Sequence, residues 1–205
     1  MAKVIRQAKD YGWVVVVDDG SDDKSFARAK AENVTVLRHL VNRGQGAALQ
    51  TGHDYAFLNG ADIVIDFDSD GQHMAEEIPT LVKPIIEEGY EAVLGSRFLA
   101  GRFSKVPFLK KWFILKPAIM LQNFILGTKL SDAHNGFRSL SRTALSKIKV
   151  QQDGMAHASE IIEQINTNNL KYKEVPVTII YNDFGQGFIS GLKILRDLLF
   201  QKLNK

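Results

Sequence analysis

Asp68-Ser69-Asp70-Gly71-Gln72-His73 follows directly on the run Ala61-Asp62-Ile63-Val64-Ile65-Asp66-Phe67, and this junction decides the fold that the sequence predicts. A short run rich in Ile and Val is typical of a buried parallel strand. Ligands of open α/β sheets bind just beyond the carboxyl ends of the strands. Carboxylates and an amide oxygen this close together suit a hard divalent cation, which keeps its other positions for water and phosphates. The junction therefore predicts a metal-bridged diphosphate at the end of a strand.

Two other interpretations of this junction were weighed against the metal site. The residues from Asp66 to Glu77 satisfy the calcium-loop pattern D-x-D-x-D-G-x5-E. An EF-hand needs an amphipathic helix on each side of the loop, however, and residues 62–67 have the composition of a strand. A solvated acidic turn is the other alternative, although such turns rarely place Asp on three alternate residues after a buried strand. We favour the metal site over both.

The composition indicates one globular domain over residues 1–205. Hydrophobic residues make up 45% of the chain and charged residues 24%, which is enough for one substantial core. The absence of cysteine excludes disulfides and thiolate metal sites and fits a reducing cytoplasm. Residues 1–12 have the pattern of an amphipathic helix, so no signal peptide is expected. The net charge of +3 and the pI near 9.0 indicate an anionic partner, such as phosphates, nucleic acid or a membrane face.

Strand-like and helix-like patterns alternate along the first half of the chain. Strands are expected at residues 13–17, 34–37, 62–67 and 91–94, with helices at 24–32, 46–58 and 75–88. The second half is less regular, and its expected elements are a strand at 137–140, a helix at 158–167, a strand at 172–181 and a basic amphipathic helix at the end. Alternation of this kind predicts βαβ units, right-handed crossovers and a mostly parallel sheet with helices on both faces.

Two further polar segments follow strands in the first half. Asp18-Asp19-Gly20-Ser21 comes after the first strand, so its carboxylates are expected to share a crevice with those of the Asp68 junction. By itself this segment reads as a common turn. Asn42-Arg43-Gly44-Gln45-Gly46 precedes a helix whose N-terminus could meet a phosphate. It matches neither the dinucleotide fingerprint nor the P-loop, so its signal alone is weak.

Taken together, these segments resemble family 2 glycosyltransferases, and most of all the polyprenyl-phosphate sugar transferases of the dolichol-phosphate mannosyltransferase type. The resemblance covers nearly the whole chain, and its segments occur in the family's order. These are Val16-Val17-Asp18-Asp19-Gly20-Ser21, Asn42 to Gly52, Asp68 to His73, Gly95-Ser96-Arg97-Phe98, Asp132 to Arg138, and Glu174-Val175-Pro176-Val177. The resemblance implies an α/β, GT-A-like sheet of the nucleotide-diphospho-sugar transferases, and inversion at the anomeric carbon.

The resemblance also implies roles for single residues. Asp68 and Asp70 match the metal-binding Asp-x-Asp, with Gln72 placed to complete the protein ligands of Mg²⁺ or Mn²⁺. Either Asp18 or Asp19 matches the acid that contacts the nucleoside, and the sequence does not decide between them. The remaining residues of the expected nucleotide-binding set are Ser21, Asn42, Gly44, Gly46 and Arg97.

The expected catalytic residues are Asp70, Asp132 and Arg138. By resemblance, Arg138 would pair with an acceptor phosphate through a bidentate contact; without the neighbouring segments, a surface ion pair would be the preferred interpretation. A phosphate acceptor is already ionised at neutral pH and needs no strong base. A sugar hydroxyl would need one, and Asp132 is then the best candidate. The metal would neutralise the departing diphosphate.

The resemblance therefore implies transfer of a glycosyl group from a UDP- or GDP-linked sugar to a polyprenyl phosphate or a glycan, without a nucleic-acid partner. The reaction is expected at the cytoplasmic face of the membrane, with the protein attached peripherally. Residues 1–100 would form the nucleotide-sugar and metal half, and residues 101–205 the acceptor and membrane half. Residues 103–127 combine Phe, Trp and Leu with Lys, which suits either an anionic interface or a core helix with its lysines reaching solvent.

Two departures from the family pattern lead to alternative expectations. No strand precedes the helix that starts near Ala2, so a gap is expected between the strands at 13–17 and 62–67. In the loop 182–187, Gln186 stands where related sequences often carry Lys. The chain is then either a glycosyltransferase whose first strand is missing or replaced, or an N-terminally truncated, inactive nucleotide-binding remnant. A nucleotidyltransferase is the third alternative, but it needs a Gly-rich loop after its first strand, and none is present.

Overall fold

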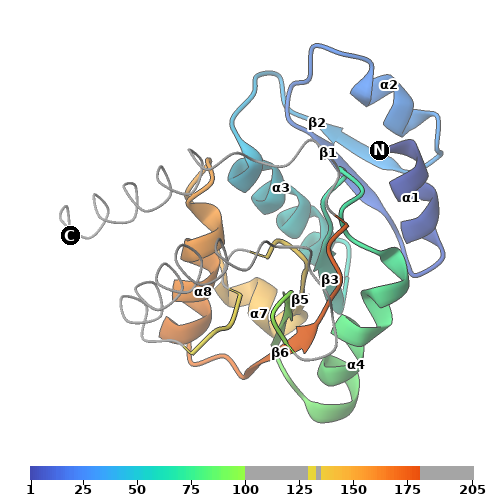
Figure 1. The fold of residues 1–205 in the computed structure, drawn as a ribbon. Helices are drawn as coiled ribbons and strands as arrows, with labels where there is room; N and C mark the ends of the chain where they lie inside the picture. The colour runs from blue at the N-terminus through green and yellow to red at the C-terminus, as the bar shows by residue number, and fades with distance from the viewer. Residues whose placement is uncertain (100–128, 133–134, 181–205) are drawn as a thin grey trace, which may run out of the picture.

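The computed structural model describes residues 1–99, 129–132 and 135–180 (Figure 1). The stretch 103–127, the C-terminal helix and the loop 182–187 lie outside the described residues, so what the sequence predicts for them stays a prediction. In the described part of the chain, no helix combines the length and the apolar character that crossing a membrane requires.

The first part of the fold is a βαβ unit bounded by helices. Its elements are α1 (Ala2–Lys9), β1 (Val15–Asp18), α2 (Ser25–Lys30), β2 (Thr35–Arg38) and α3 (Gln45–Leu58). β1 and β2 pair in parallel, with Val15 opposite Thr35, as the crossover through α2 requires. The helix and strand pattern of the sequence therefore predicted these elements to within a few residues.

The second part of the fold is a four-stranded sheet with the order β3-β5-β4-β6. Its elements are β3 (Ile63–Asp66), η1 (Ala75–Glu77), α4 (Ile78–Glu88), β4 (Ala92–Ser96), β5 (Arg138–Ser141), α7 (Arg142–Lys147), α8 (His157–Thr167) and β6 (Tyr172–Pro176). β4 and β6 are parallel, whereas β5 runs antiparallel to both of its neighbours. The expected α/β fold is present, but β5 makes this sheet mixed.

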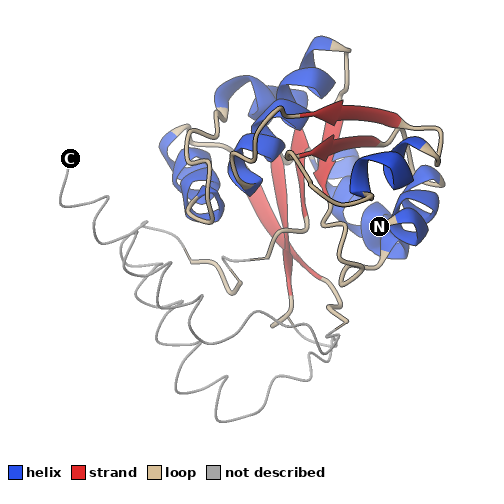
Figure 2. Ribbon diagram, turned by 90° about the horizontal axis from the view of Figure 1, so that it is seen from above, coloured by secondary structure: helices blue, strands red, loops and turns tan. Residues whose placement is uncertain are grey.

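Helices cover both faces of the four-stranded sheet, as predicted (Figure 2). Successive side chains of a strand point to opposite faces, and Leu94 and Val93 of β4 accordingly belong to different clusters of buried side chains. Leu94 packs in the cluster with Ile161 of α8, and Val93 in the cluster with Leu81 of α4. All four side chains are at most 4% exposed. The sheet therefore has two apolar faces, which makes it a rigid base for the loops at its ends.

A cavity of about 630 Å³ separates β1 from β3. No hydrogen-bonded ladder joins these two strands in the described residues. The walls of the cavity come from the two strands and from α1 and α3, and residues 14–17 and 63–65 supply mostly β-branched side chains to it. The two strands β1 and β3 and the two helices α1 and α3 therefore enclose the cavity. The gap expected between these two strands is therefore present in the described residues.

We predict that the separation of the two sheets is visible in amide hydrogen exchange. β4 and β5 are each paired on both edges, whereas β1 is paired only with β2. Amides of β4 and β5 should therefore exchange at least about tenfold more slowly than those of β1 and β2, because fewer local openings expose them. Exchange measured by NMR tests this. Equal protection in all four strands would contradict the separation.

Candidate active site

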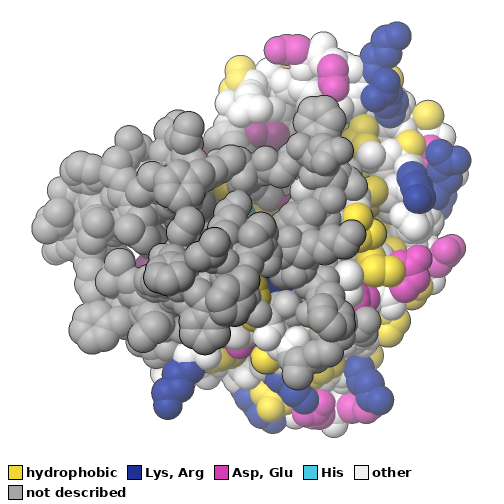
Figure 3. Space-filling view, viewed as in Figure 1, with side chains coloured by type: hydrophobic (Ala, Val, Ile, Leu, Met, Phe, Trp, Pro, Cys, Tyr) yellow, Lys and Arg dark blue, Asp and Glu magenta, His cyan; other side chains and the backbone are white. Residues whose placement is uncertain are grey.

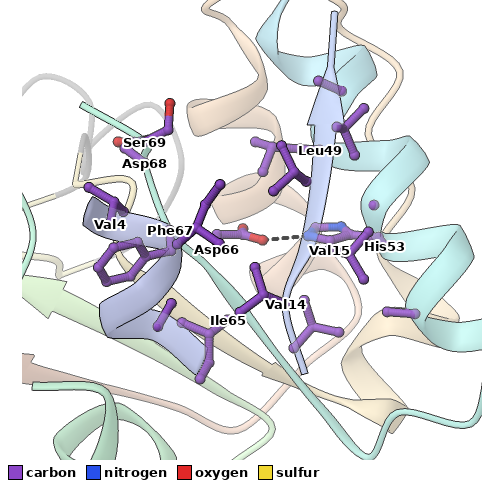
Figure 4. Close-up of a pocket in the computed structure, with 18 of the residues that line it drawn as sticks. Val4, Val14, Val15, Leu49, His53, Ile65, Asp66, Phe67, Asp68 and Ser69 are labelled. Atoms are coloured by element: carbon purple, nitrogen blue, oxygen red, sulfur yellow. Dashed lines mark hydrogen bonds and ion pairs between the residues drawn. The ribbon is translucent and has the colours of Figure 1, made fainter. Parts of the chain in front are cut away.

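The loops after β1 and β3 meet at the polar end of the cavity. Its lining there consists of Asp18, Asp19, Ser21, Gln45, Asp68 and Ser69, and the rest of its lining is mainly apolar. Figure 4 shows Asp66 at the end of β3 and Asp68 and Ser69 just beyond it. The strand ends that the sequence singled out therefore share one crevice.

Asp68 lines this crevice, and Asp70 follows two residues later in the exposed part of the loop. Gln45 donates to Oδ1 of Asp68 over 3.1 Å, and the backbone N–H of Gln72 donates to Oδ1 of Asp70 over 2.9 Å. Burial raises the pKa of Asp68, the negative charges of Asp70 and Asp66 raise it further, and positive charge nearby opposes this only in part. Ionisation of Asp68 is therefore less favourable than that of an ordinary Asp, and a nearby cation would offset this cost.

These residues fit a divalent metal ion that takes only part of its coordination from the protein. A desolvated carboxylate beside a second carboxylate gains most from a cation. Within the described ranges, no group of three or more His, Cys, Asp or Glu side chains could hold a metal by itself. A metal held by Asp68 and Asp70, with Gln72 nearby, would therefore need the phosphates of a nucleotide and water to complete its shell, which is how Mg²⁺ is commonly bound.

Asp66, two residues before Asp68, belongs to a buried cluster with His53 and Arg138 that the sequence did not predict. His53 Nε2 lies 2.6 Å from Asp66 Oδ1 (Figure 4), and Arg138 Nε lies 3.5 Å from Asp66 Oδ2. Burial alone would raise the pKa of Asp66, but the charge and hydrogen bond of His53 and the charge of Arg138 outweigh it and lower the pKa. The three side chains are each at most 5% exposed. Asp66 was visible in the sequence only as part of the calcium-loop pattern, and His53 gave no signal.

Arg138 lies elsewhere than its predicted role requires. Its residue is 1% exposed, and its guanidinium faces Asp66 and the carbonyl of Gly136. Its positive charge also lowers the pKa of Asp68. In this arrangement Arg138 belongs to the buried cluster around Asp66, and its predicted contact with an acceptor phosphate stays a prediction.

The structure separates the two acidic residues that follow β1. The carboxylate of Asp19 accepts from His39 Nδ1 at 2.6 Å and from the backbone N–H groups of Arg43 at 3.0 Å and Gly44 at 2.6 Å. These bonds overcome the effect of burial and lower the pKa of Asp19. Asp18 is buried and lines the cavity, with Oδ2 3.1 Å from Arg38 Nε. Asp19 therefore anchors a loop, whereas Asp18 is buried at the cavity wall, and the contact of either acid with a nucleoside stays a prediction.

The glycines at the start of α3, Gly44 just before it and Gly46 in its first turn, allow close packing. Gly44 has a φ of +111°, which favours glycine, and the N–H of Gly46 donates to the carbonyl of Asp153 over 2.8 Å. A Cβ atom on either glycine would collide with the backbone of residues 152–153. This N–H at the start of α3 is thus already bonded. Of the other predicted nucleotide residues, Ser21 lines the cavity and Asn42 is exposed.

Arg97 and Asp132 form a two-pronged ion pair beside the end of β4. Arg97 donates from Nε to Oδ2 and from a terminal nitrogen to Oδ1, both over 2.7 Å, and its backbone N–H donates to Oδ2 over 3.0 Å. Asp132 is 3% exposed. Both oxygens of the predicted general base therefore already accept from Arg97, and the role as a base stays a prediction.

Comparison with known proteins identifies the family. Residues 1–149 match the model of glycosyl transferase family 2. The chain belongs to glycosyl transferase family 2. An uncharacterized protein of Methanocaldococcus jannaschii is 36% identical over 99% of this chain and 87% of its own length. The UDP-N-acetylglucosamine–dolichyl-phosphate N-acetylglucosaminyltransferase of Methanococcus voltae is 31% identical over 97% of this chain and 88% of its own length.

Solved structures confirm the GT-A-like fold of this glycosyltransferase. Glucosyl-3-phosphoglycerate synthase from Mycobacterium tuberculosis, solved in complex with Mn²⁺ and uridine-diphosphate-glucose, aligns with a TM-score of 0.73. The alignment covers 99% of this chain and 73% of the synthase at 20% sequence identity. At this identity the likeness concerns the fold. The fold that the sequence predicted from its alternating pattern and its resemblance is therefore confirmed.

We predict that Gly136→Ala weakens the metal site. A Cβ atom at Gly136 would lie 2.8 Å from Oδ2 of Asp68, so the carboxylate must move. Gly154→Ala is the matched control, because a Cβ atom there has open space. Titration of Mn²⁺ with a nucleoside diphosphate should show at least about tenfold weaker binding for the first variant, as expected when a charged ligand is displaced, and parental binding for the second. Equal affinities of the two variants would remove Asp68 from the site.

Proposed function

We propose that this glycosyltransferase moves a sugar from a nucleoside diphosphate to a polyprenyl phosphate, with Mg²⁺ or Mn²⁺ held by Asp68 and Asp70. The observation that carries the proposal is the placement of Asp68, which lines the polar end of a large cavity, accepts from Gln45 and precedes Asp70 by two residues. Burial and the charge of Asp70 also raise the pKa of Asp68. Such a pair is poised for a cation together with the phosphates that complete its coordination. The relative from Methanococcus voltae, named for a dolichyl-phosphate acceptor, supports the lipid phosphate.

The residues of the chain divide the work as follows in this proposal. Asp18 accepts from the nucleoside, and Gln45 orients Asp68 through the bond to Oδ1. Arg97 presents a fixed positive charge toward the phosphates. The bound metal ion supplies neutralisation of the negative charge that develops on the departing diphosphate. Inversion at the anomeric carbon, which the resemblance implies, belongs to the proposal as well.

The state of Asp132 favours a phosphate acceptor over a sugar hydroxyl. A hydroxyl acceptor must lose a proton to a base during transfer, and the expected base, Asp132, has both carboxylate oxygens bonded to Arg97. A phosphate monoester is largely ionised at neutral pH and can attack without a base. Because a phosphate acceptor needs no general base, the engagement of Asp132 by Arg97 supports a lipid phosphate as the acceptor.

Peripheral attachment to the cytoplasmic face of the membrane is part of the proposal. On the described part of the face in Figure 3, Lys and Arg side chains are interspersed with Asp and Glu and are not gathered into one patch. The proposed contact therefore rests on the sequence of residues 103–127, in the proposed acceptor half at 101–205, while residues 1–100 form the proposed nucleotide half.

We predict that Asp70→Asn abolishes metal-dependent binding of the nucleotide and leaves the fold intact, because Asp70 is an exposed metal ligand. Asp62→Asn is the control, since Asp62 is also exposed but lies just before the other end of β3. Calorimetry of GDP or UDP with Mn²⁺ is the measurement. In the parent, Mn²⁺ affinity should begin to fall at a higher pH than it would for a carboxyl group of ordinary pKa, because the pKa of Asp68 is raised by burial and protons compete with the metal. Unchanged metal dependence in the Asp70 variant would refute the metal assignment.

We propose, as a second function, that these 205 residues alone bind the nucleotide but transfer sugar poorly. The cavity between β1 and β3 favours this alternative, because both strands present an unpaired backbone edge to it. At its wall His53 Nδ1 lacks a hydrogen-bond partner among the described residues, while Asp18 Oδ2 and Asp66 Oδ2 are engaged through ion pairs with Arg38 and Arg138. Buried polar atoms are normally satisfied. An extended segment in the cavity would pair both edges and complete the wall of the nucleotide pocket.

We predict that an N-terminal extension of about 30 residues, the length of a strand with its turn and the start of a helix, raises the melting temperature and the turnover together. The control is the same extension with Pro at alternate positions of the strand, because Pro cannot donate to a ladder. Should the chain without an extension turn over at about 1 per second, a rate usual for enzymes, and gain nothing from the extension, this second proposal is wrong.

A further inference from the structure

The carboxylate of Glu174 holds two successive backbone N–H groups of another segment. Ser131 donates its N–H to both oxygens of Glu174, at 2.9 and 3.0 Å, and its hydroxyl to Oε1 at 2.9 Å. Asp132 donates its N–H to Oε1 at 3.1 Å. Hydrogen bonds to an ionised acceptor are stronger than neutral ones. Glu174 therefore fixes the backbone from which the Asp132 side chain projects.

Arg97 is fixed from two sides at the end of the neighbouring strand. Glu174 of β6 lies opposite Leu94 of β4, and the register continues to the end of β4, where Val177 donates to the carbonyl of Ser96 over 3.0 Å. Ser96, which is fully buried, also has its hydroxyl 2.6 Å from that of Ser131. The backbone before Arg97 and the carboxylate that grips its guanidinium are thus both tied to β6.

The Arg97 guanidinium is close enough to the acidic crevice to act on it. Its side chain is 21% exposed, and Gly95, two residues before it, donates its N–H to the carbonyl of Phe137 over 2.9 Å. Gly136, which precedes Phe137, lies against the Asp68 carboxylate, since a Cβ atom there would be 2.8 Å from Oδ2. Arg97 therefore follows the end of a strand that borders the acidic crevice. A cation held rigidly at such a place stabilises developing negative charge without having to reorganise.

We propose that Glu174 is a positioning residue that holds Asp132, and through Asp132 the Arg97 guanidinium, in place for the leaving diphosphate. The inference rests on the proposed function for the identity of the ligand. The chain of contacts from Glu174 to Arg97 is a matter of geometry, and it can be tested without any ligand.

The test uses Glu174→Gln, which keeps the shape of the side chain. Its amide NH₂ group cannot accept from the N–H groups of Ser131 and Asp132, so part of the bonding is lost. Glu91→Gln is the matched control, because Glu91 precedes β4 and its carboxylate likewise accepts a backbone N–H, that of Lys171 at 2.8 Å. In NMR spectra, the Nε–H of Arg97, assigned by its loss in Arg97→Lys, should exchange at least about tenfold faster in Glu174→Gln, in line with the loss of charge-assisted bonds. It should stay as slow as in the parent in Glu91→Gln. Slow exchange in Glu174→Gln overturns the proposal.

A binding measurement separates this inference from the proposed function. With Mn²⁺ present, Glu174→Gln should weaken UDP or GDP by about tenfold and leave the corresponding monophosphate unchanged, since Arg97 is meant for the diphosphate. Equal losses for both ligands would mean a general structural role and overturn the inference. If the parent binds neither ligand, the proposed function fails, while the exchange of Arg97 Nε–H still decides the role of Glu174. Should Glu174→Gln not fold, Glu174→Asp, which keeps the charge but shortens the reach, replaces it in both measurements.

Discussion

Negative charge concentrated at the end of one strand is the constraint on which the rest of this structure depends. Asp66, Asp68 and Asp70 stand on alternate residues, and the first two are removed from solvent in part or in full. The protein neutralises only the innermost of them, through His53 and Arg138. Asp68 keeps a raised pKa, so its charge is left for a cation to compensate. Asp66 is therefore compensated within the core, whereas Asp68 and Asp70 are left for the proposed cation.

The second constraint is continuity of the sheet. β1 and β3 carry the acidic loops, yet they belong to separate hydrogen-bonded sheets with an apolar cavity between them. The packing of α1 and α3 around that cavity keeps both strand ends at the same crevice. The position of Asp18 relative to Asp68 therefore depends on helix packing and on the loop that Asp19 anchors, because no ladder connects the two strands. The geometry of the site therefore depends on how β1 and β3 are held across the cavity.

Local pattern predicted the elements well, and it predicted contacts between distant residues poorly. The Ile-Val run before Asp68 and the alternation along the first half gave β1 to β4 and their helices because period and turn chemistry are local properties. The antiparallel direction of β5 depends on its partners in space, which no period records. The burial of Arg138 against Asp66 is likewise a contact that no local pattern records. The hydrogen bonds of Asp19 to the backbone of residues 43 and 44 also depend on a loop that is distant in the sequence.

The central claim is that a divalent cation binds between Asp68 and Asp70 together with the diphosphate of a nucleotide. An anomalous difference map recorded at the manganese edge, from crystals grown with Mn²⁺ and GDP or UDP, tests it most directly. The account predicts one strong peak bonded to oxygens of Asp68, Asp70 and the diphosphate. A peak elsewhere, or nucleotide bound in the crevice without manganese at these two carboxylates, would contradict it.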